Sequence, residues 1–308
     1  LLILKITFSI FKIFLLKKIH LVHVRSYIPA IICYNFLKLF NFKLIFDMRG
    51  FWIDERVDWN IWNKKSIKYV FFKYLEKKII FKSHAIVTLT NDASYYIKKN
   101  FKIHHQTKIY VIPTSTQCNN NYKKNNFKNI LNLTYLGAIG TRYDFNKVIK
   151  FFNLISKKIN TKLLIFNKDE HEKILSYLKY NNISLDKFTL KYIKPNLINK
   201  NITDYALGIF FPVKGFYLKG YFPTKLGEFL SNGVPVITCS INRHVDTIIV
   251  ENNVGIIINN LNNLDHKNLL INIKDLINEN TSKRCISVAK KYLNIDNAIE
   301  TYEKIYKI

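Results

Sequence analysis

The fold is decided by residues 222–237, which read FPTKLGEFLSNGVPVI. Pro223 can stand at a helix start, where its missing N–H costs nothing. Gly233 and Pro235 can end that helix and begin the next buried strand. A helix that leads directly into a buried strand is the repeating step of an α/β domain.

The same stretch carries groups that suit a nucleotide. Thr224 lies in the first turn of the expected helix, whose free N–H groups form an anion site. Lys225 supplies a point charge for a diphosphate. Glu228 lies one helical turn further on, on the Lys225 face, and could accept hydrogen bonds from vicinal ribose hydroxyls. The alternative is an ordinary surface helix with a Lys–Glu pair.

Working outward from this stretch, short apolar runs alternate with amphipathic ones. Strands are expected at 20–26, 42–48, 84–90, 108–112, 131–136, 161–166, 188–193, 206–211, 234–239 and 254–258. Helices are expected at 1–16, 64–82, 144–158, 169–180, 224–232, 264–279 and 293–308, with a further helix capped by Asn91–Asp92. This alternation predicts parallel sheets with right-handed crossovers.

Residues 117–129 are polar and lack periodicity, so they are expected to be a linker. The predicted architecture is therefore two doubly wound α/β domains facing a cleft, at 1–127 and 128–292, with a closing helix at 293–308. Only Gly50 of the nine glycines precedes residue 137, which favours a nucleotide site in the second domain. The absence of an early glycine turn and the initial Leu1 suggest that the first domain is incomplete.

Several segments resemble family 4 (group 1) glycosyltransferases, which have the GT-B fold. Residues 223–237 resemble the family's Pro-x-Lys-x-x-Glu signature followed by Gly-x-Pro-Val. Weaker resemblances lie at 135–140, a glycine turn, and at 111–113, 205–209 and 254–256. Residues 23–26 and 47–50 resemble one bacterial branch of the family, which acts in envelope polysaccharide biosynthesis.

The resemblance implies that Glu228 binds ribose and that Lys225 and Arg142 hold the diphosphate. It also implies that the N–H groups at 137–141, among them those of Gly137, Gly140 and Thr141, line the same pocket. The family often has a second Glu that contacts the donor sugar. Gly220 stands at that position here, so the contact is absent or is made by backbone at 221–224. The Asp that often follows the strand at 108–112 is also missing, with Gln117 nearby.

The expected activity is transfer of a sugar from a nucleoside-diphosphate-sugar to a glycan or lipid-linked acceptor, without a metal or a cofactor. By resemblance the transfer retains the anomeric configuration and serves polysaccharide or lipopolysaccharide assembly in the cell envelope. One alternative is a GT-B sugar-nucleotide epimerase. The other is a truncated, non-catalytic basic protein that binds membrane or nucleic acid.

The acceptor side is expected at two strand ends of the first domain. Catalytic candidates are Asp47, Arg49 and His23, and acceptor-side candidates are Arg25, Asp54 and Glu55. Doubly wound folds place ligands at the carboxyl ends of strands, where a carboxylate or imidazole could orient an acceptor hydroxyl and arginines could bind an anionic acceptor. The alternative is a structural ion-pair network, with His23 as hydrogen-bonded scaffolding.

The chain is strongly basic, with 48 Lys and Arg against 21 Asp and Glu, a net charge of +27. This charge either reflects compositional bias or attracts anionic lipid headgroups and phosphorylated substrates. No recognisable module indicates specific nucleic-acid binding. The helix at 64–82 is either a solvated lysine-rich face or a membrane-docking surface.

The compartment is expected to be cytoplasmic, with peripheral association at the inner face of the membrane as an option. The four cysteines are widely spaced, which favours reduced thiols. Residues 1–16 are apolar but shorter than the ~20 residues that span a bilayer, and Lys5 and Lys12 interrupt them. They are expected to form a helix packed on a sheet. Trp52, Trp59 and Trp62 are expected to pack a loop rather than stack on a sugar.

Overall fold

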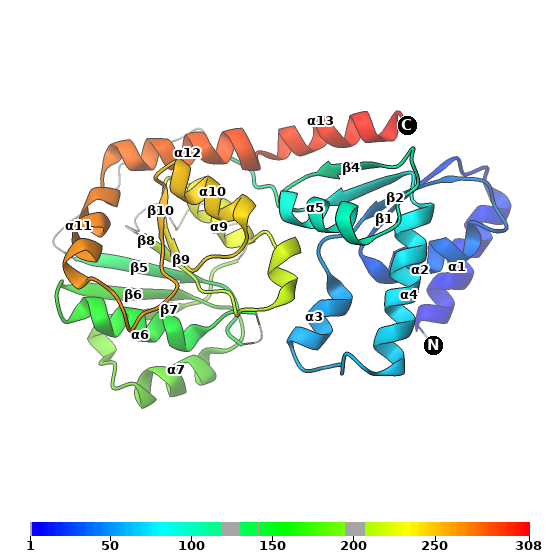
Figure 1. Cartoon of the computed structure of the whole chain (residues 1–308). Coiled ribbons are helices and arrows are strands. Elements are labelled where there is room, and N and C mark those ends of the chain that lie inside the picture. The colour runs from blue at the N-terminus through cyan, green and yellow to red at the C-terminus, as the bar shows by residue number, and fades with distance from the viewer. Residues whose placement is uncertain (1, 119–129, 141, 195–206) are drawn as a thin grey trace. The chain divides into compact units, whose positions relative to one another are not determined.

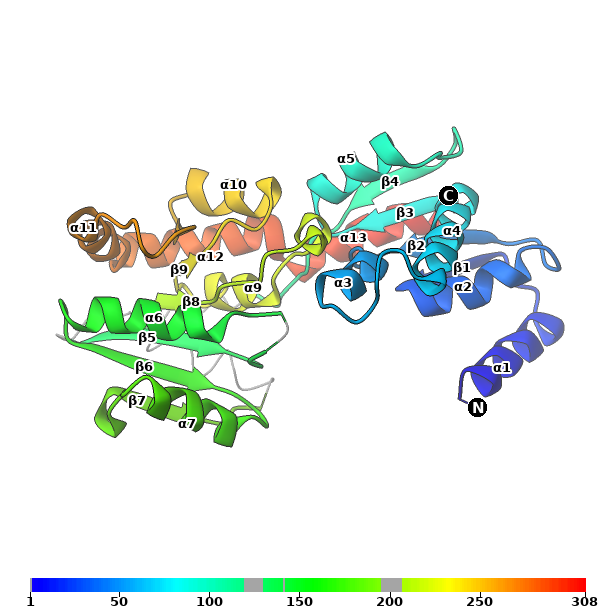
Figure 2. The ribbon, with the colours of Figure 1, turned by 60° about the horizontal axis from the view of Figure 1, so that its bottom comes forward.

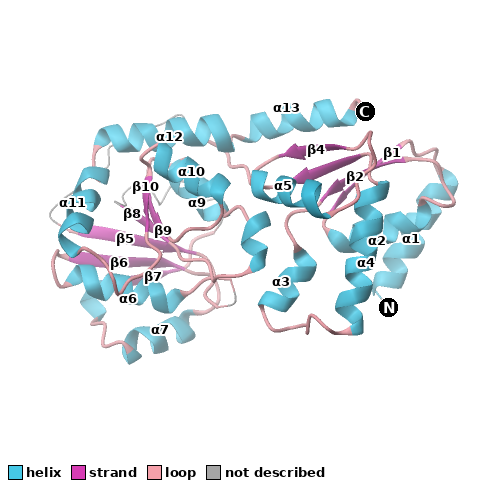
Figure 3. Cartoon of the chain, in the orientation of Figure 1, coloured by secondary structure: helices cyan, strands magenta, loops and turns pink. Residues whose placement is uncertain are grey.

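The computed structural model describes residues 2–118, 130–140, 142–194 and 207–308, and it divides into two compact units (Figure 1). The first unit comprises the chain up to Pro113 together with Gly215–Phe222 and Ile299–Ile308. The second comprises Thr114–Lys214 and Pro223–Ala298. Each unit has one parallel sheet flanked by helices (Figure 3), which confirms the expected α/β class. No helix in the described part of the chain combines the length and apolarity needed to cross a membrane.

The first unit is built on a four-stranded sheet of order β1-β2-β3-β4. Its strands are β1 (Leu21–Arg25), β2 (Lys43–Asp47), β3 (Ala85–Thr88) and β4 (Lys108–Val111). Its helices are α1 (Leu2–Leu16), α2 (Tyr27–Phe36), α3 (Trp52–Asp58), α4 (Ile67–Lys82) and α5 (Asn91–Asn100). Val24 pairs with Phe46 and Ile45 with Ala85, so the polar ends of β1 and β2 lie side by side.

Local sequence explains these elements. Leu44, Ile45 and Phe46 of β2 are fully buried, as expected for a strand covered on both faces. Helix α5 begins at Asn91 because the Thr90 side chain caps it and accepts a hydrogen bond from the Ala93 amide at 3.0 Å. The expectation that residues 91–92 form the cap was therefore wrong. Helix α1 packs on α2 (Figure 2).

The second unit has a six-stranded sheet of order β10-β9-β8-β5-β6-β7. Its strands are β5 (Leu131–Leu136), β6 (Thr161–Phe166), β7 (Phe188–Lys191), β8 (Leu207–Ile209), β9 (Val236–Thr238) and β10 (Gly255–Ile257). Its helices are α6 (Phe145–Ser156), α7 (His171–Tyr180), α9 (Thr224–Leu230), α10 (Arg243–Glu251), α11 (His266–Leu276) and α12 (Glu279–Leu293). The strand order reverses between β5 and β8, and such a switch point is where doubly wound sheets bind ligands.

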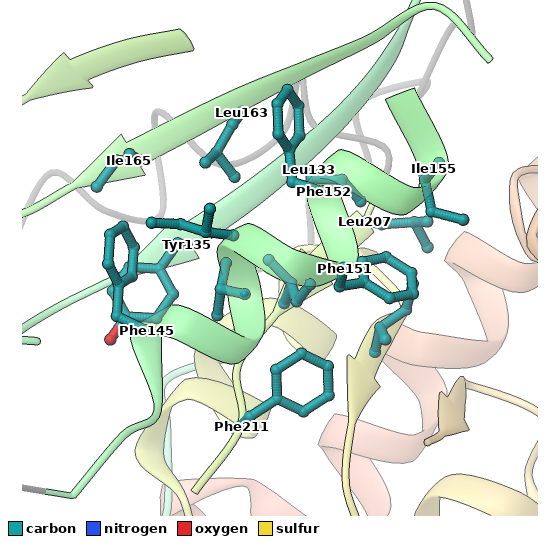
Figure 4. Close-up of a cluster of buried hydrophobic side chains, with 14 of the residues drawn as sticks. Leu133, Tyr135, Phe145, Phe151, Phe152, Ile155, Leu163, Ile165, Leu207 and Phe211 are labelled. Carbon is teal, nitrogen blue, oxygen red and sulfur yellow. The ribbon is translucent and has the colours of Figure 1, made fainter. Parts of the chain in front are cut away.

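The core of this unit lies between the sheet and α6. Phe145, Phe151 and Phe152 of α6 are buried with Leu133 and Tyr135 of β5 (Figure 4). The six buried residues of this helix recur at helical spacing, so the core fixes which face of α6 turns inward. This packing fixes the position of the carboxyl end of β5 and of the turn that follows it.

The unit boundary differs from the expected boundary at residue 127. Residues 114–118 belong to the second unit because the Thr116 amide donates to the Leu293 carbonyl at 2.7 Å. Gly215–Phe222 belong to the first unit because the Tyr217 amide donates to Asp58 Oδ2 at 2.7 Å. Most of the expected linker, 119–129, lies outside the described residues.

Four α-helices of the described chain were not predicted, namely α2, α3, α10 and α12. Helix α3 has only seven residues, and α2 carries a proline in its first turn. Helix α12 is rich in polar residues, and its buried apolar positions are few and small. The last helix, α13 (Ile295–Tyr306), begins in the second unit and contributes its part from Ile299 onward to the first.

Candidate functional site

The turn after β5 is held in a fixed conformation by the surrounding strand ends. Gly137 has φ +91° and Gly140 has φ +121°, conformations that side chains strain. The Gly137 amide donates to the Phe166 carbonyl at 2.8 Å, and the Ile139 amide donates to Glu170 Oε2 at 2.6 Å. These two amides are therefore used inside the unit. The expectation that all the N–H groups of this turn line a ligand pocket was wrong for these two.

Lys225 lies beside this turn. A Cβ on Gly137 would come within 3.3 Å of Lys225 Cε, so the lysine packs directly against the glycine turn. The Lys225 ammonium lies 3.4 Å from the centroid of the Tyr143 ring and 4.1 Å from that of Tyr135. Lys225 and the glycine turn are far apart in sequence, and they meet at the switch point of the sheet.

The Lys225 ammonium is buried without a hydrogen-bond partner among the described residues, and the residue is 4% exposed. Burial lowers the pKa of Lys225 well below its usual value, while the negative charges of Glu228 and Glu170 act in the opposite sense. Among the described residues this ammonium lies over two aromatic rings without a hydrogen-bond acceptor, so its donors are unsatisfied and an anion would satisfy them.

Glu228 lies one turn further along α9 and is half-buried. Desolvation raises the pKa of Glu228, and Lys225 lowers it. Thr224 is exposed at the start of α9, and Pro223 occupies the cap position before it. Arg142 is exposed, and Thr141 lies outside the described residues. The structure therefore brings Lys225, Glu228 and Gly137 together within one unit.

Sequence reasoning missed the polar groups at the end of β6. Asn167 Nδ2 donates to the Gly137 carbonyl at 3.1 Å and to Glu170 Oε2 at 3.0 Å. These two residues fix the glycine turn from the neighbouring strand. The rule that polar residues after a buried strand mark a site, applied to β6, would have found them.

The first unit holds a second group of polar side chains, at the ends of β1 and β2. Asp47 is 2% exposed, and its Oδ2 accepts a hydrogen bond from the Tyr302 hydroxyl at 3.1 Å. His23 Nε2 lies 3.9 Å from the same oxygen, and His23 Nδ1 lies 2.8 Å from the Tyr306 hydroxyl. Asp47 Oδ1 and His23 Nε2 are buried without a hydrogen bond from any described residue. Both atoms therefore have unused hydrogen-bonding capacity at this pair of strand ends.

The electrostatics of this group follow from burial. Desolvation raises the pKa of Asp47, and Arg49, the Tyr302 hydrogen bond, His23 and Arg25 lower it. Desolvation also lowers the pKa of His23. The structure thus brings four of the expected residues together, and it adds the two tyrosines of α13, which the sequence analysis did not select.

Arg49 also lines a small cavity. It has a volume of about 70 Å³ and is lined by Arg49, Gly50, Phe51, Trp52, Glu55, Tyr217, Gly220 and Tyr221. A Cβ on Gly220 would lie 3.0 Å from both the Gly50 Cα and the Phe51 ring. A side chain at residue 220 would therefore press on the 50–51 backbone and ring, which is consistent with glycine at the position where the family often has a second Glu.

Asp54 does not join the acceptor-side group. Its Oδ1 accepts a hydrogen bond from the Tyr69 hydroxyl at 2.9 Å, and its Oδ2 forms an ion pair with Lys73 at 3.0 Å. Lys73 also pairs with Glu76, which accepts a hydrogen bond from the Tyr27 hydroxyl at 2.5 Å. Both carboxylate oxygens of Asp54 are thus used in an internal network, so its acceptor-side role stays a prediction that these contacts do not support. Glu55 remains at the cavity.

The tryptophans contact neighbouring side chains, and Trp52 does so from helix α3 rather than from a loop. Trp52 and Trp62 lie 5.4 Å apart by ring centroids, and Arg56 lies over Trp52 and Trp59. In the described parts of the chain, no three His, Cys, Asp or Glu side chains are grouped as a metal site would require.

Comparisons with known proteins extend this description. Residues 193–292 match the family described as "Glucosyltransferase 3-like, C-terminal domain". A search of curated proteins finds no match.

Solved structures with a similar fold cover most of the chain. A glycosyltransferase from Rickettsia africae superposes with a TM-score of 0.71 at 16% identity, covering 99% of this chain and 80% of that one. Sucrose-phosphate synthase from Thermosynechococcus elongatus gives 0.68 at 14% identity, covering 93% and 73%. TarM from S. aureus, in complex with fondaparinux, alpha-GlcNAc-glycerol and UDP, gives 0.62 at 17% identity, covering 87% of this chain and 51% of TarM, so this chain spans about half of it. The chain has the GT-B glycosyltransferase fold, and its C-terminal part is similar to the C-terminal domain of glucosyltransferase 3-like proteins.

Proposed function

We propose that the protein is a glycosyltransferase that moves a sugar from a nucleoside-diphosphate-sugar to a glycan or lipid-linked acceptor. The observation that carries the proposal is the buried Lys225 ammonium, which lacks a hydrogen-bond partner among the described residues and lies against a glycine turn at the switch point of the second sheet. The GT-B fold and the match at 193–292 support the same class of reaction.

On the donor side, Lys225 would hold the diphosphate, assisted by the exposed Arg142. As the bond to the sugar breaks, negative charge develops on the leaving diphosphate, and a fixed cation in a dry site stabilises it. Because Gly137 lacks a side chain, the diphosphate could approach the backbone of this turn closely. Glu228 would accept hydrogen bonds from the ribose hydroxyls. UDP is the first nucleotide to test, because TarM was solved with UDP.

On the acceptor side, Asp47 would accept a hydrogen bond from the acceptor hydroxyl through Oδ1. Burial raises the pKa of Asp47, which makes its carboxylate a stronger base, and His23 Nε2 could contact the same hydroxyl. Arg25 and Arg49 would attract an acceptor that carries phosphate or another anion. We extend the proposal to retention of configuration and to envelope polysaccharide or lipopolysaccharide assembly on the basis of the sequence resemblance.

The test is a thermal-shift panel of nucleoside diphosphates and their sugars. A diphosphate of the correct base is expected to raise the melting temperature, and Lys225→Ala and Glu228→Ala to abolish that rise. Normal responses from both variants would refute the site. Release of the nucleoside diphosphate from the sugar nucleotide, followed by product analysis, then separates glycosyl transfer from isomerisation of the donor.

A further inference from the structure

The outward face of α4 in the first unit is unusual for a surface helix. Ile67 is 88% exposed, Val70 60%, Phe71 54% and Tyr74 55%. These four side chains recur at spacings of three and four residues, so they form one stripe along the first two turns of the helix. The solvent-facing positions of a surface helix are ordinarily polar, so a stripe of exposed apolar side chains needs another explanation.

The opposite face of α4 is already used by the core. Ile79, Ile80 and Glu76 are buried on it. The helix is therefore apolar on two sides, and only one of them packs within the unit. Long apolar side chains that are more than half exposed lower solubility unless they contact a partner.

The charge around the stripe has one sign. Exposed lysines flank it and continue its line toward the end of the helix: Lys64, Lys65, Lys68, Lys77, Lys78 and Lys82. The only acidic residue of α4 is Glu76, which is buried and paired with Lys73. The exposed surface of this helix therefore combines apolar side chains with uncompensated positive charge.

We propose that this α4 surface, defined by Ile67, Val70, Phe71 and Tyr74 with Lys77 and Lys78, docks on a membrane that contains anionic lipid. Its aromatic and aliphatic side chains enter the headgroup boundary, and the lysines reach the phosphates. Nucleic acid would be matched by the lysines but not by the aliphatic stripe. The proposal does not depend on the nucleotide site, and it accords with a lipid-linked acceptor.

The experiment uses the full chain and sedimented vesicles, either of phosphatidylcholine alone or with about one third phosphatidylglycerol. Binding is expected only to the anionic vesicles and is expected to weaken as salt rises. The double variant Lys77→Gln/Lys78→Gln removes charge, and Val70→Ser/Phe71→Ser removes apolar contact. Each is expected to lower the partition coefficient roughly tenfold or more.

Matched controls separate this surface from general basicity. Lys157→Gln/Lys158→Gln removes an exposed lysine pair after α6, and Leu175→Ser/Tyr180→Ser removes exposed apolar groups from α7. Both controls are expected to bind vesicles like the wild type. All variants are also titrated with UDP, so loss of vesicle binding with normal nucleotide binding is read separately from failure of the proposed function.

Several results would overturn the proposal. Equal losses in the control variants would assign binding to net charge. Normal vesicle binding by Val70→Ser/Phe71→Ser would show that the apolar stripe does not contribute, so the lysines would form a purely electrostatic site, such as one for nucleic acid. A loss caused instead by Phe8→Ser, on the exposed apolar face of α1, would move the docking surface to that helix.

Discussion

Replacing Lys225 with methionine should change stability and ligand binding in opposite directions. The variant keeps most of the side-chain volume and removes a buried charge that lacks a hydrogen bond among the described residues. Taking an ammonium out of water costs several kcal/mol, whereas its contacts with the Tyr135 and Tyr143 rings return only about 0.5–2 kcal/mol. We therefore expect Lys225→Met to raise the free energy of unfolding in the absence of ligand, by about 1 kcal/mol or more.

The pH dependence gives this prediction a second readout. Burial lowers the pKa of Lys225 in the folded protein, so between that value and the usual lysine pKa the unfolded chain holds the proton and the folded chain does not. Unfolding then takes up a proton, and stability rises as pH increases through this window. Each unit of pKa lowering corresponds to about 1.4 kcal/mol. In Lys225→Met this rise should be lost. A gain of 1 kcal/mol corresponds to about 2–4 °C in the melting temperature.

Binding should move the other way. A hydrogen bond to a charged group contributes about 1.5–3 kcal/mol, so the dissociation constant for UDP should rise roughly 10- to 150-fold in Lys225→Met. Calorimetry measures the affinity, and thermal unfolding over a pH series measures the stability.

Lys147 offers a matched control, because its ammonium lies 4.6 Å from the Phe211 ring centroid but donates to the Ile258 carbonyl at 3.3 Å. Lys147→Met should melt at a lower temperature and bind UDP normally. A Lys225→Met protein that is less stable than the wild type, with unchanged UDP affinity, would refute the reasoning.

Four further predictions concern other parts of the chain. Glu170→Gln keeps an acceptor for the glycine turn and removes a negative charge near the proposed diphosphate, so UDP should bind several-fold more tightly by calorimetry. Tyr302→Phe removes a hydrogen bond that lowers the pKa of Asp47, so the acidic limb of the turnover profile should move to higher pH; an unchanged profile would exclude Asp47 as a group that must be ionised. Lys73→Met leaves two buried carboxylates without their cation and should lower the free energy of unfolding by about 3–5 kcal/mol in urea. Gly220→Ala forces a contact of 3.0 Å with backbone and should cost about 1–3 kcal/mol in the same assay, while an exposed glycine-to-alanine change would not.

The sheets and the donor side could be predicted because their signals are local. Most strands are short apolar runs, and most runs of the second unit have glycine, proline or asparagine at one end or both. The 222–237 stretch places a cation and a carboxylate one helical turn apart, so a sequence alone shows that they share a face. What it could not show was burial. That Lys225 lies under two tyrosine rings follows from the packing of α9 against β5, which no local pattern encodes.

Two features of the first unit lay beyond sequence reasoning for physical reasons. Asp54 and Glu55 are neighbours in sequence, but they lie on different faces of α3, one toward Lys73 and one toward the cavity at Arg49. Helix α3 is too short for its periodicity to distinguish these faces. The segment 215–222 joins the first unit through contacts such as the hydrogen bond from the Tyr217 amide to the Asp58 side chain, and the sequence pattern of the segment does not reveal this long-range pairing.

The tyrosines of α13 show why the acceptor side is harder to predict than the donor side. Tyr302 and Tyr306 are separated from His23 and Asp47 by more than 250 positions, and a tyrosine on an amphipathic helix is most simply explained as packing. Their hydroxyls nevertheless form hydrogen bonds with His23 Nδ1 and Asp47 Oδ2. Asp47 Oδ1 and His23 Nε2 then have no hydrogen-bond partner among the described residues. Helix α13 therefore determines which atoms of His23 and Asp47 are already hydrogen-bonded within the unit. For this reason, substitutions at Tyr302 should change the pH profile of turnover more than they change the free energy of unfolding.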